Sequence, residues 1–126
     1  MKVARILGDT RGTSAIEFGV TAPVFFMLLI GVIECGLLLW TQLGLQHGAG
    51  LAARCASINT SLCGSASAVQ NYAAQQAFGL NPSPSAFTFT AEPCGNQVSA
   101  AYTFQFVTTY LGLPTLTLSA RSCFPK

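Results

Sequence analysis

The chain has 126 residues, of which 51% are apolar and only 8% are charged. The length suits one modest domain, but so few charges cannot cover an ordinary water-exposed surface, which indicates a membrane segment. The net charge of +2 includes no basic patch that would neutralise phosphates, so a nucleic-acid partner is excluded.

The excess positive charge lies entirely at the N-terminus. Lys2, Arg5 and Arg11 precede the apolar run, with Asp9 as their only acidic offset. From residue 13 onward, three basic residues balance three acidic ones (Arg54, Arg121 and Lys126 against Glu17, Glu34 and Glu92). Because basic flanks stay cytoplasmic, we expect the N-terminus inside and everything after Trp40 outside.

A long apolar helix is predicted next. The sixteen residues Phe18–Ile33 carry no charge and cover about 24 Å as a helix, and continuation to Trp40 spans a hydrocarbon layer of about 30 Å. Trp40 stands where an interfacial aromatic anchor is expected. No proline interrupts residues 41–55, so the helix is expected to project from the membrane to about Ala56. Three glycines weaken this projecting part, so packing must support it (Gly44, Gly48 and Gly50).

Three ordinary explanations of the apolar run compete. A cleaved secretory signal has a core of about 7–15 apolar residues, whereas this run is longer, contains Pro23 and has Glu34 where the core should end. A lipoprotein signal needs a small residue before its cysteine, and here Glu34 precedes Cys35. A plain signal anchor fits the length but gives no reason for Glu17.

Glu17 is the unusual residue of this segment. An ionised carboxylate in a bilayer costs at least about 2.5 kcal/mol even on insertion scales. Arg5 or Arg11 could pair with it by snorkelling. If the chain is instead cut after Gly12, Thr13 becomes a positively charged amino terminus and Glu17 the fifth residue of the mature chain. Its carboxylate can then meet the amine of a neighbouring subunit in a helical bundle, which gives it a use in assembly and registry.

The residues GTSAIEF at 12–18 resemble the class III signal peptide of type IV pilin-like proteins, in which a prepilin peptidase cuts after the glycine and glutamate stands fifth. More closely, RGTSAIEF at 11–18 with TAP at 21–23 and IECG at 33–36 resembles the TadE-like family. The resemblance is strong over residues 11–56 and loose beyond them. Cys35 stands where the family more often has a bulky apolar residue.

The resemblance implies a minor pseudopilin of the tight-adherence (Flp) pilus machinery, cut between Gly12 and Thr13 and acting in pilus assembly, adhesion and biofilm. Its implied partners are the prepilin peptidase, other pilins or pseudopilins, the inner-membrane assembly platform and membrane lipid. Glu17, Phe18 and Glu34 are implied in processing or assembly, although proximity to the outer headgroups explains Glu34 equally well. Gly12 suits the cut because a missing side chain lets the backbone approach the peptidase's catalytic aspartates.

The expected organisation is a leader at 1–12, a transmembrane and projecting helix at 13–56 and a periplasmic α+β domain at 57–126, held in a bacterial inner membrane by a single span. The alternative is an uncleaved bitopic module whose domain binds a ligand or protein in the periplasm. Retention of the leader and independence from Glu17 would favour that alternative.

The exported part begins with helix and loop signals. Small polar residues at 57–67 predict a loop, and Val69, Tyr72, Ala73 and Ala77 share one face of a short helix at 66–78. Gly79 is the predicted stop, and residues 81–85 a turn.

After the turn, apolar residues alternate with polar ones at a period of two. This pattern predicts strands at 87–90, 98–106 and 116–120, with turns at 92–96 and 111–114. The result is a three-stranded antiparallel sheet with one face on the helices, a small pilin-like architecture. The alternating aromatic residues are interpreted as core rather than as a stacking surface for a ligand.

Four cysteines in an exported region predict two disulfides, while Cys35 lies in the apolar run. Of the three possible pairings, we prefer Cys55–Cys63, which closes a short loop, with Cys94–Cys123, which closes a longer one.

Catalytic chemistry is not expected. His47 is the only histidine, the only aspartate is in the N-terminal segment, and Glu92 is the only carboxylate of the exported part. A Ser-His-Asp set and a metal site with three good ligands therefore cannot be built, and no cofactor is expected. We interpret His47 as interfacial or subunit-facing because no acid–base partner is evident.

Overall fold

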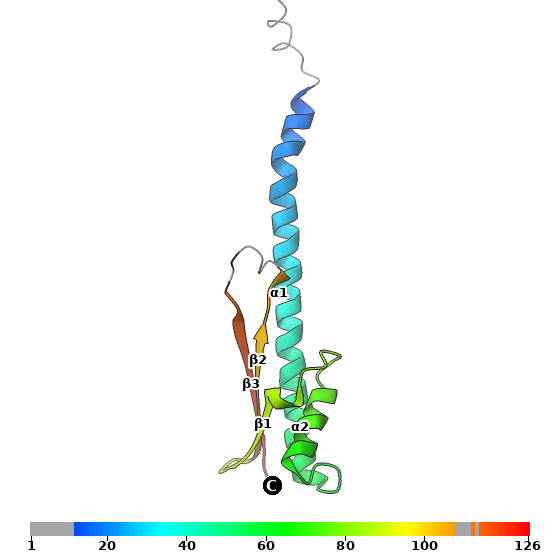
Figure 1. Ribbon diagram of the computed structural model, residues 1–126, viewed down its shortest axis with the longest axis vertical. Helices are drawn as coiled ribbons and strands as arrows, with labels where there is room; N and C mark the ends of the chain where they lie inside the picture. Colours follow the sequence, from blue (N-terminus) through cyan, green and yellow to red (C-terminus); the bar gives the residue numbers. More distant parts are fainter. Residues whose placement is uncertain (1–11, 108–111, 113) are drawn as a thin grey trace, which may run out of the picture. The chain divides into compact units, whose positions relative to one another are not determined.

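The chain is α+β, with a long apolar helix, a short second helix and a three-stranded antiparallel sheet, as the sequence predicted (Figure 1). The computed structural model describes residues 12–107, 112 and 114–126. The expected leader, apart from Gly12, and part of the expected turn at 111–114 lie outside the described residues. The chain divides into two compact units, one ending at Cys35 and the other comprising Gly36–Lys126.

The long helix α1 comprises Thr13–Ile58 and contributes to both units. It has 46 residues and ends two residues beyond the expected Ala56. Within the described residues it is the one helix long and apolar enough to cross a membrane, with a mean hydropathy of 2.3 in its most apolar window. By length and composition, the chain is consistent with a single-pass membrane protein.

The second helix α2, Ala66–Gln75, is shorter than predicted. It begins because the Ser65 hydroxyl accepts a hydrogen bond from the Ala68 N–H at 3.2 Å, an ordinary N-cap. The expected end at Phe78 was wrong, since the helix already ends at Gln75. Phe78 and Gly79 both have positive φ angles, 46° and 74°, so the chain leaves the helix before the predicted glycine stop.

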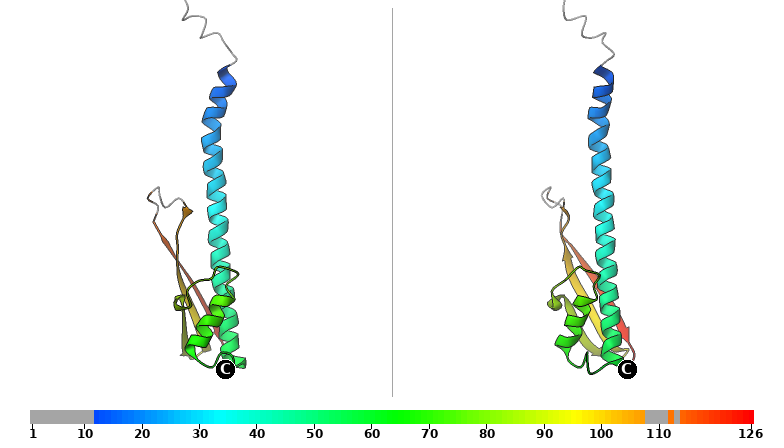
Figure 2. Two further views of the ribbon diagram at one scale, coloured as in Figure 1. Left: turned by 45° about the vertical axis from the view of Figure 1, so that its right-hand side comes forward. Right: turned by 90° about the vertical axis from the view of Figure 1, so that its right-hand side faces the viewer.

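The sheet has the order β1-β2-β3, with β1 at Phe87–Glu92, β2 at Gly95–Phe104 and β3 at Leu116–Phe124. A short 3₁₀ turn, η3 at Pro84–Ala86, leads into β1. Both strand pairs are antiparallel (Figure 2). Phe87 is opposite Ala100, and Phe104 is opposite Leu116.

The strand limits differ from the prediction at both ends of β2. The expected turn at 92–96 is a two-residue hairpin, because Glu92 and Gly95 already pair. Gly95 has φ 128°, and a Cβ there would collide with the Phe124 carbonyl, so this position requires glycine. β2 ends at Phe104 instead of 106, and β3 continues to Phe124 instead of ending at 120.

The core of the Gly36–Lys126 unit lies between one face of the sheet and the two helices (Figure 2). Its largest fully buried side chains come from all three parts (Leu45 of α1, Val69 of α2, Phe87 and Val98 of the sheet). The alternating aromatic residues of the strands are buried or packed against this core, which confirms their assignment. The helices contribute mostly alanine (Ala49, Ala52, Ala53, Ala56, Ala73 and Ala74).

Two of the three weakening glycines allow the chain around α2 to approach α1 closely. A Cβ on Gly48 would stand 2.6 Å from the Ala73 carbonyl oxygen of α2, and one on Gly44 would stand 3.1 Å from that of Ala77, just after α2. Four residues apart on α1, these glycines present bare backbone to α2 and to the turn that follows it. The packing expected to support the projecting helix is therefore supplied by the domain of the same chain.

Candidate functional site

The predicted cleavage site lies where α1 begins. Gly12 is the residue before the helix and Thr13 is its first residue, and both are exposed. A Cβ added to Gly12 would meet nothing within 4 Å, so the described part of the chain gives no packing reason for glycine. A requirement for glycine here would have to come from a partner that approaches the backbone.

Glu17 and Phe18 lie on the first turns of α1, and both are exposed. The Thr21 hydroxyl donates to the Glu17 carbonyl oxygen at 2.8 Å, so the backbone at this point is satisfied within the helix. Phe18 and Thr21 also line an open apolar groove on the same unit, with Ala22, Phe25 and Phe26. Glu17 thus offers a carboxylate directly beside an apolar surface that a second helix can cover.

Glu34 has the opposite environment. Only 6% of its surface is accessible, although it belongs to the same apolar run as Glu17. The two carboxylates of the run are therefore not equivalent.

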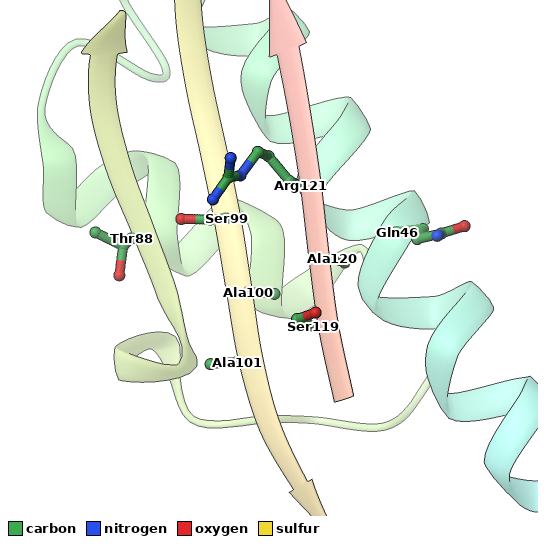
Figure 3. A pocket seen from close by; sticks show the side chains of 8 residues that line it. All are labelled: Gln46, Thr88, Ser99, Ala100, Ala101, Ser119, Ala120 and Arg121. Atoms are coloured by element: carbon green, nitrogen blue, oxygen red, sulfur yellow. The ribbon is translucent and has the colours of Figure 1, made fainter. Parts of the chain in front are cut away.

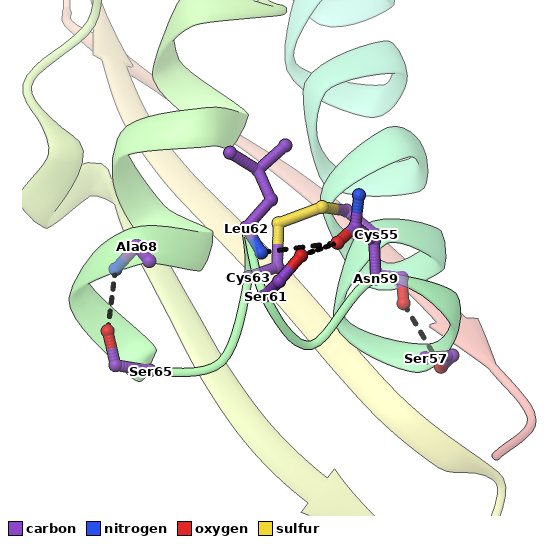
Figure 4. Close-up of a disulfide and its surroundings, with 9 residues drawn as sticks. Cys55, Ser57, Asn59, Ser61, Leu62, Cys63, Ser65 and Ala68 are labelled. Carbon is purple, nitrogen blue, oxygen red and sulfur yellow. Dashed lines mark hydrogen bonds between the residues drawn. A yellow bond between two sulfur atoms is a disulfide. The ribbon is translucent and has the colours of Figure 1, made fainter.

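The structure contains the preferred pairing of cysteines. Cys55–Cys63 joins the last turns of α1 to the following loop (Figure 4). Cys94–Cys123 joins the β1–β2 hairpin to β3. Their Cα atoms are 5.8 and 6.3 Å apart, within the ordinary range for a disulfide. Cys35, in the apolar run, is free and exposed.

The loop closed by Cys55–Cys63 is also ordered by hydrogen bonds. The Asn59 side-chain oxygen accepts from the Ser61 hydroxyl at 2.7 Å and from the Leu62 N–H at 3.2 Å (Figure 4). The nearly buried Asn96 amide donates to the Ser57 hydroxyl at 3.0 Å, which ties the start of β2 to the end of α1. The disulfides and these bonds stabilise the domain rather than form a reactive site.

Sequence reasoning missed an aromatic cluster on the outside of the domain. Phe78 stacks on the His47 ring at 4.2 Å with an interplanar angle of 17°, and its centroid lies 6.1 Å from that of Trp40. All three residues are exposed. Trp40 and His47 were recognised as interfacial candidates, but no local signal indicates that Phe78 joins them, because the contact depends on the turn after α2.

A shallow hollow on the outer face of the sheet is the other feature that the sequence did not indicate. Thr88, Ser99 and Arg121 cross its floor on three adjacent strands, and Gln46 of α1 borders it (Figure 3). Its described lining has hydroxyls and one cation but no carboxylate or imidazole, so it contains no acid–base pair. Among residues 12–107, 112 and 114–126, no three His, Cys, Asp or Glu side chains are grouped to hold a metal ion.

Comparison with protein families adds one finding. Residues 12–54 match the family model described as TadE-like protein. This confirms the resemblance seen in the sequence, and the TadE-like segment, residues 12–54, begins at Gly12 itself. It covers most of α1 and leaves α2 and the sheet outside. Searches among curated proteins and among solved structures found no match.

Proposed function

We propose that the protein is a minor pseudopilin of a tight-adherence (Flp) pilus machinery and acts in pilus assembly, in support of surface adhesion and biofilm formation. The observation that carries the proposal is the TadE-like match, which starts at Gly12 where the long apolar helix is about to begin. The role is structural, with other pilins or pseudopilins and the inner-membrane assembly platform as partners.

Processing is the first step of the proposed function. A prepilin peptidase cuts between Gly12 and Thr13, after which Thr13 carries the new amino group. Gly12 is exposed, and nothing in the described part of the chain would meet a Cβ there, which supports access by such a peptidase. The basic N-terminal segment remains cytoplasmic, α1 spans the bacterial inner membrane and the disulfide-containing domain faces the periplasm, where disulfides persist.

Assembly is the second step. Within the described part of the chain no ion pair involves Glu17, and its apolar surroundings disfavour an isolated charge. The amino group of Thr13 on a neighbouring subunit compensates that charge, while the neighbouring helix covers the groove at Phe18. Both events stabilise the same side-by-side arrangement of helices.

The mature N-terminus decides whether the chain is processed. We expect protein purified from its native membrane to begin at Thr13, as read by intact mass and N-terminal sequencing. Gly12→Val should leave the leader in place, whereas Gly31→Val, at an exposed helical glycine with equal free space, should still be cut. A wild-type chain that starts at Met1 would favour the uncleaved bitopic binding module, and one that starts near Gly36 would indicate an ordinary signal peptide.

The role of Glu17 is tested separately. Glu17→Ala should leave membrane insertion intact but reduce pilus number and surface adhesion, because the intersubunit charge pair is lost. Glu92→Ala, which removes an exposed carboxylate of the β1–β2 hairpin, is the matched control and should assemble normally. Normal piliation by the Glu17 variant would refute the assembly role.

A further inference from the structure

One end of the Gly36–Lys126 unit is apolar, exposed and built from three separate segments. Trp40 of α1 and Phe78 of the turn after α2 are 58% and 49% exposed although their rings are neighbours. Val107, after β2, and Leu116, the first residue of β3, are 69% and 43% exposed. We call these four residues the apolar rim.

Two hydrogen bonds fix how β3 lies along α1 and therefore at which end of the unit Leu116 stands. The Gln42 amide donates to the Ser119 carbonyl at 2.8 Å, and the Ser57 hydroxyl donates to the Phe124 carbonyl at 3.3 Å. β3 therefore runs in the same direction as this part of α1. Leu116 lies three residues before Ser119, about 10 Å toward the start of the helix at 3.3 Å per residue.

Like Leu116, Trp40 lies on the N-terminal side of the Gln42–Ser119 hydrogen bond along α1. It precedes Gln42 by two residues, about 3 Å of helix. Phe104, the last residue of β2, pairs with Leu116, so Val107 continues beyond the same end of the sheet. The β2–β3 end of the sheet thus lies on the side from which α1 enters this unit (Figure 1).

The charges of the unit lie away from the rim. Its four charged residues are Arg54, Glu92, Arg121 and Lys126. Arg54 follows Trp40 by fourteen residues, about 21 Å of helix, while Glu92 is in the hairpin opposite the rim. Arg121 and Lys126 follow Ser119 toward that same far end. The domain is therefore polarised, with an uncharged aromatic end and a charged end.

We propose that the apolar rim seats the domain on the lipid surface, in the headgroup layer of the leaflet from which α1 emerges. The helix that could cross a membrane is Thr13–Ile58, and the polar Thr41 and Gln42 follow Trp40 in it, so Trp40 stands where an interfacial residue of this helix is expected. Aromatic rings prefer this layer because they combine apolar area with tolerance of a polar boundary. Phe78 adds a second ring to the anchor that Trp40 alone would provide.

This seating is independent of the pilus function, since a bitopic module would use it equally. It restricts how the domain is oriented on its helix. A domain held at the bilayer by three segments presents the outer face of its sheet sideways, rather than swinging on a free stalk.

The experiment uses the full chain in vesicles of phosphatidylethanolamine and phosphatidylglycerol, with the domain outside. Trp40 is the only tryptophan, so Trp40→Phe gives a dark background into which Phe78→Trp or Val107→Trp is introduced. Ile58→Trp is the matched control, because Ile58 is 65% exposed on the same unit but at the far end of α1.

Lipid spin-labelled near the headgroup should quench tryptophan at 78 and 107, with emission shifted to shorter wavelength, and should leave tryptophan at 58 unquenched. Aqueous iodide should show the reverse order. Equal iodide quenching at all three positions, or lipid quenching at only one rim position, would overturn the proposal. Protection that grows with the protein-to-lipid ratio without lipid quenching would overturn it in favour of a second copy of the chain. If Phe78→Trp fails to form both disulfides, Val107→Trp decides.

Discussion

The two parts of α1, before and after Gly36, differ in how much of their apolar surface the chain itself buries. Before Gly36, bulky residues such as Phe25, Met27 and Leu28 are exposed all round the helix. After Gly36, the buried positions are mainly glycine and alanine, with Leu45 as the large exception. The same helix thus changes from a largely exposed apolar surface to one that its own domain covers on one side.

The difference shows what each part requires. A helix that is hydrophobic on every side needs lipid or neighbouring helices around it. A helix that presents small residues allows a second helix to approach closely and buries little area per residue, so the fit must be good. The first part therefore depends on its environment and the second on the packing of α2 and the sheet.

The sharpest test of this comparison uses the same residue type in both parts. Leu45→Ala removes a fully buried side chain and should lower the free energy of unfolding of the domain by about 4 kcal/mol. Leu28→Ala, at an exposed leucine of the first part, should change it by less than about 0.5 kcal/mol. Denaturant unfolding of the full chain in detergent, followed by Trp40 fluorescence, measures both. Similar losses for the two variants would contradict the division.

Removal of the longer disulfide should have the next largest effect. Cys94 and Cys123 are 29 residues apart, and loop-closure entropy predicts a loss of about 3.5 kcal/mol for a loop of this size. For Cys55–Cys63, with a separation of 8, the same relation gives about 2.5 kcal/mol. The paired serine variants, compared by thermal unfolding, should follow this order, and both should still insert in membranes. Reversal of the order would mean that local strain or packing outweighs chain entropy.

The glycines test the close packing itself. Gly48→Ala places a methyl group against the Ala73 carbonyl and should destabilise the domain by about 1–3 kcal/mol despite the better helix propensity of alanine. Gly50→Ala is the control on the same helix, because its Cβ would meet only the Ser122 hydroxyl at an ordinary 3.7 Å. Gly50→Ala should be neutral or slightly stabilising in the same unfolding assay. A neutral Gly48→Ala would show that α2 can move away without loss.

Much of this structure follows from periodicity in the sequence. Apolar and polar residues alternate along a half-buried strand because successive side chains point to opposite faces of the sheet. The positions of Val98 and Ala100 therefore predict the inner face of β2, and both are buried. The position of the β1–β2 hairpin was predicted, but its loop was predicted too long because Gly95 was assigned to the turn. In the structure Gly95 pairs with Glu92 and lies against the Phe124 backbone, a tertiary contact that the local sequence does not indicate.

The candidate site divides in the same way. Gly12 and Glu17 could be proposed from the sequence because their spacing lies in one contiguous motif. Phe78 was missed because its place beside Trp40 and His47 depends on a turn with positive φ, which no helical or strand period encodes. The burial of Glu34 was missed for a related reason, since the sequence around it predicts only an apolar helix.

The smallest expected effect concerns the cap of α2, the helix that encloses the second part of α1. Ser65→Ala removes the acceptor of the Ala68 N–H and should destabilise the domain by about 1 kcal/mol. Ser83→Ala is the matched control, because Ser83 also precedes a helical turn but its side chain makes no capping bond. Hydrogen exchange of the α2 amides separates the two: exchange should become faster in the Ser65 variant and stay unchanged in the Ser83 variant. If both variants behave alike, the packing of α2 against Gly48 and the sheet holds the helix without the cap, and the cap adds nothing to the enclosure of α1.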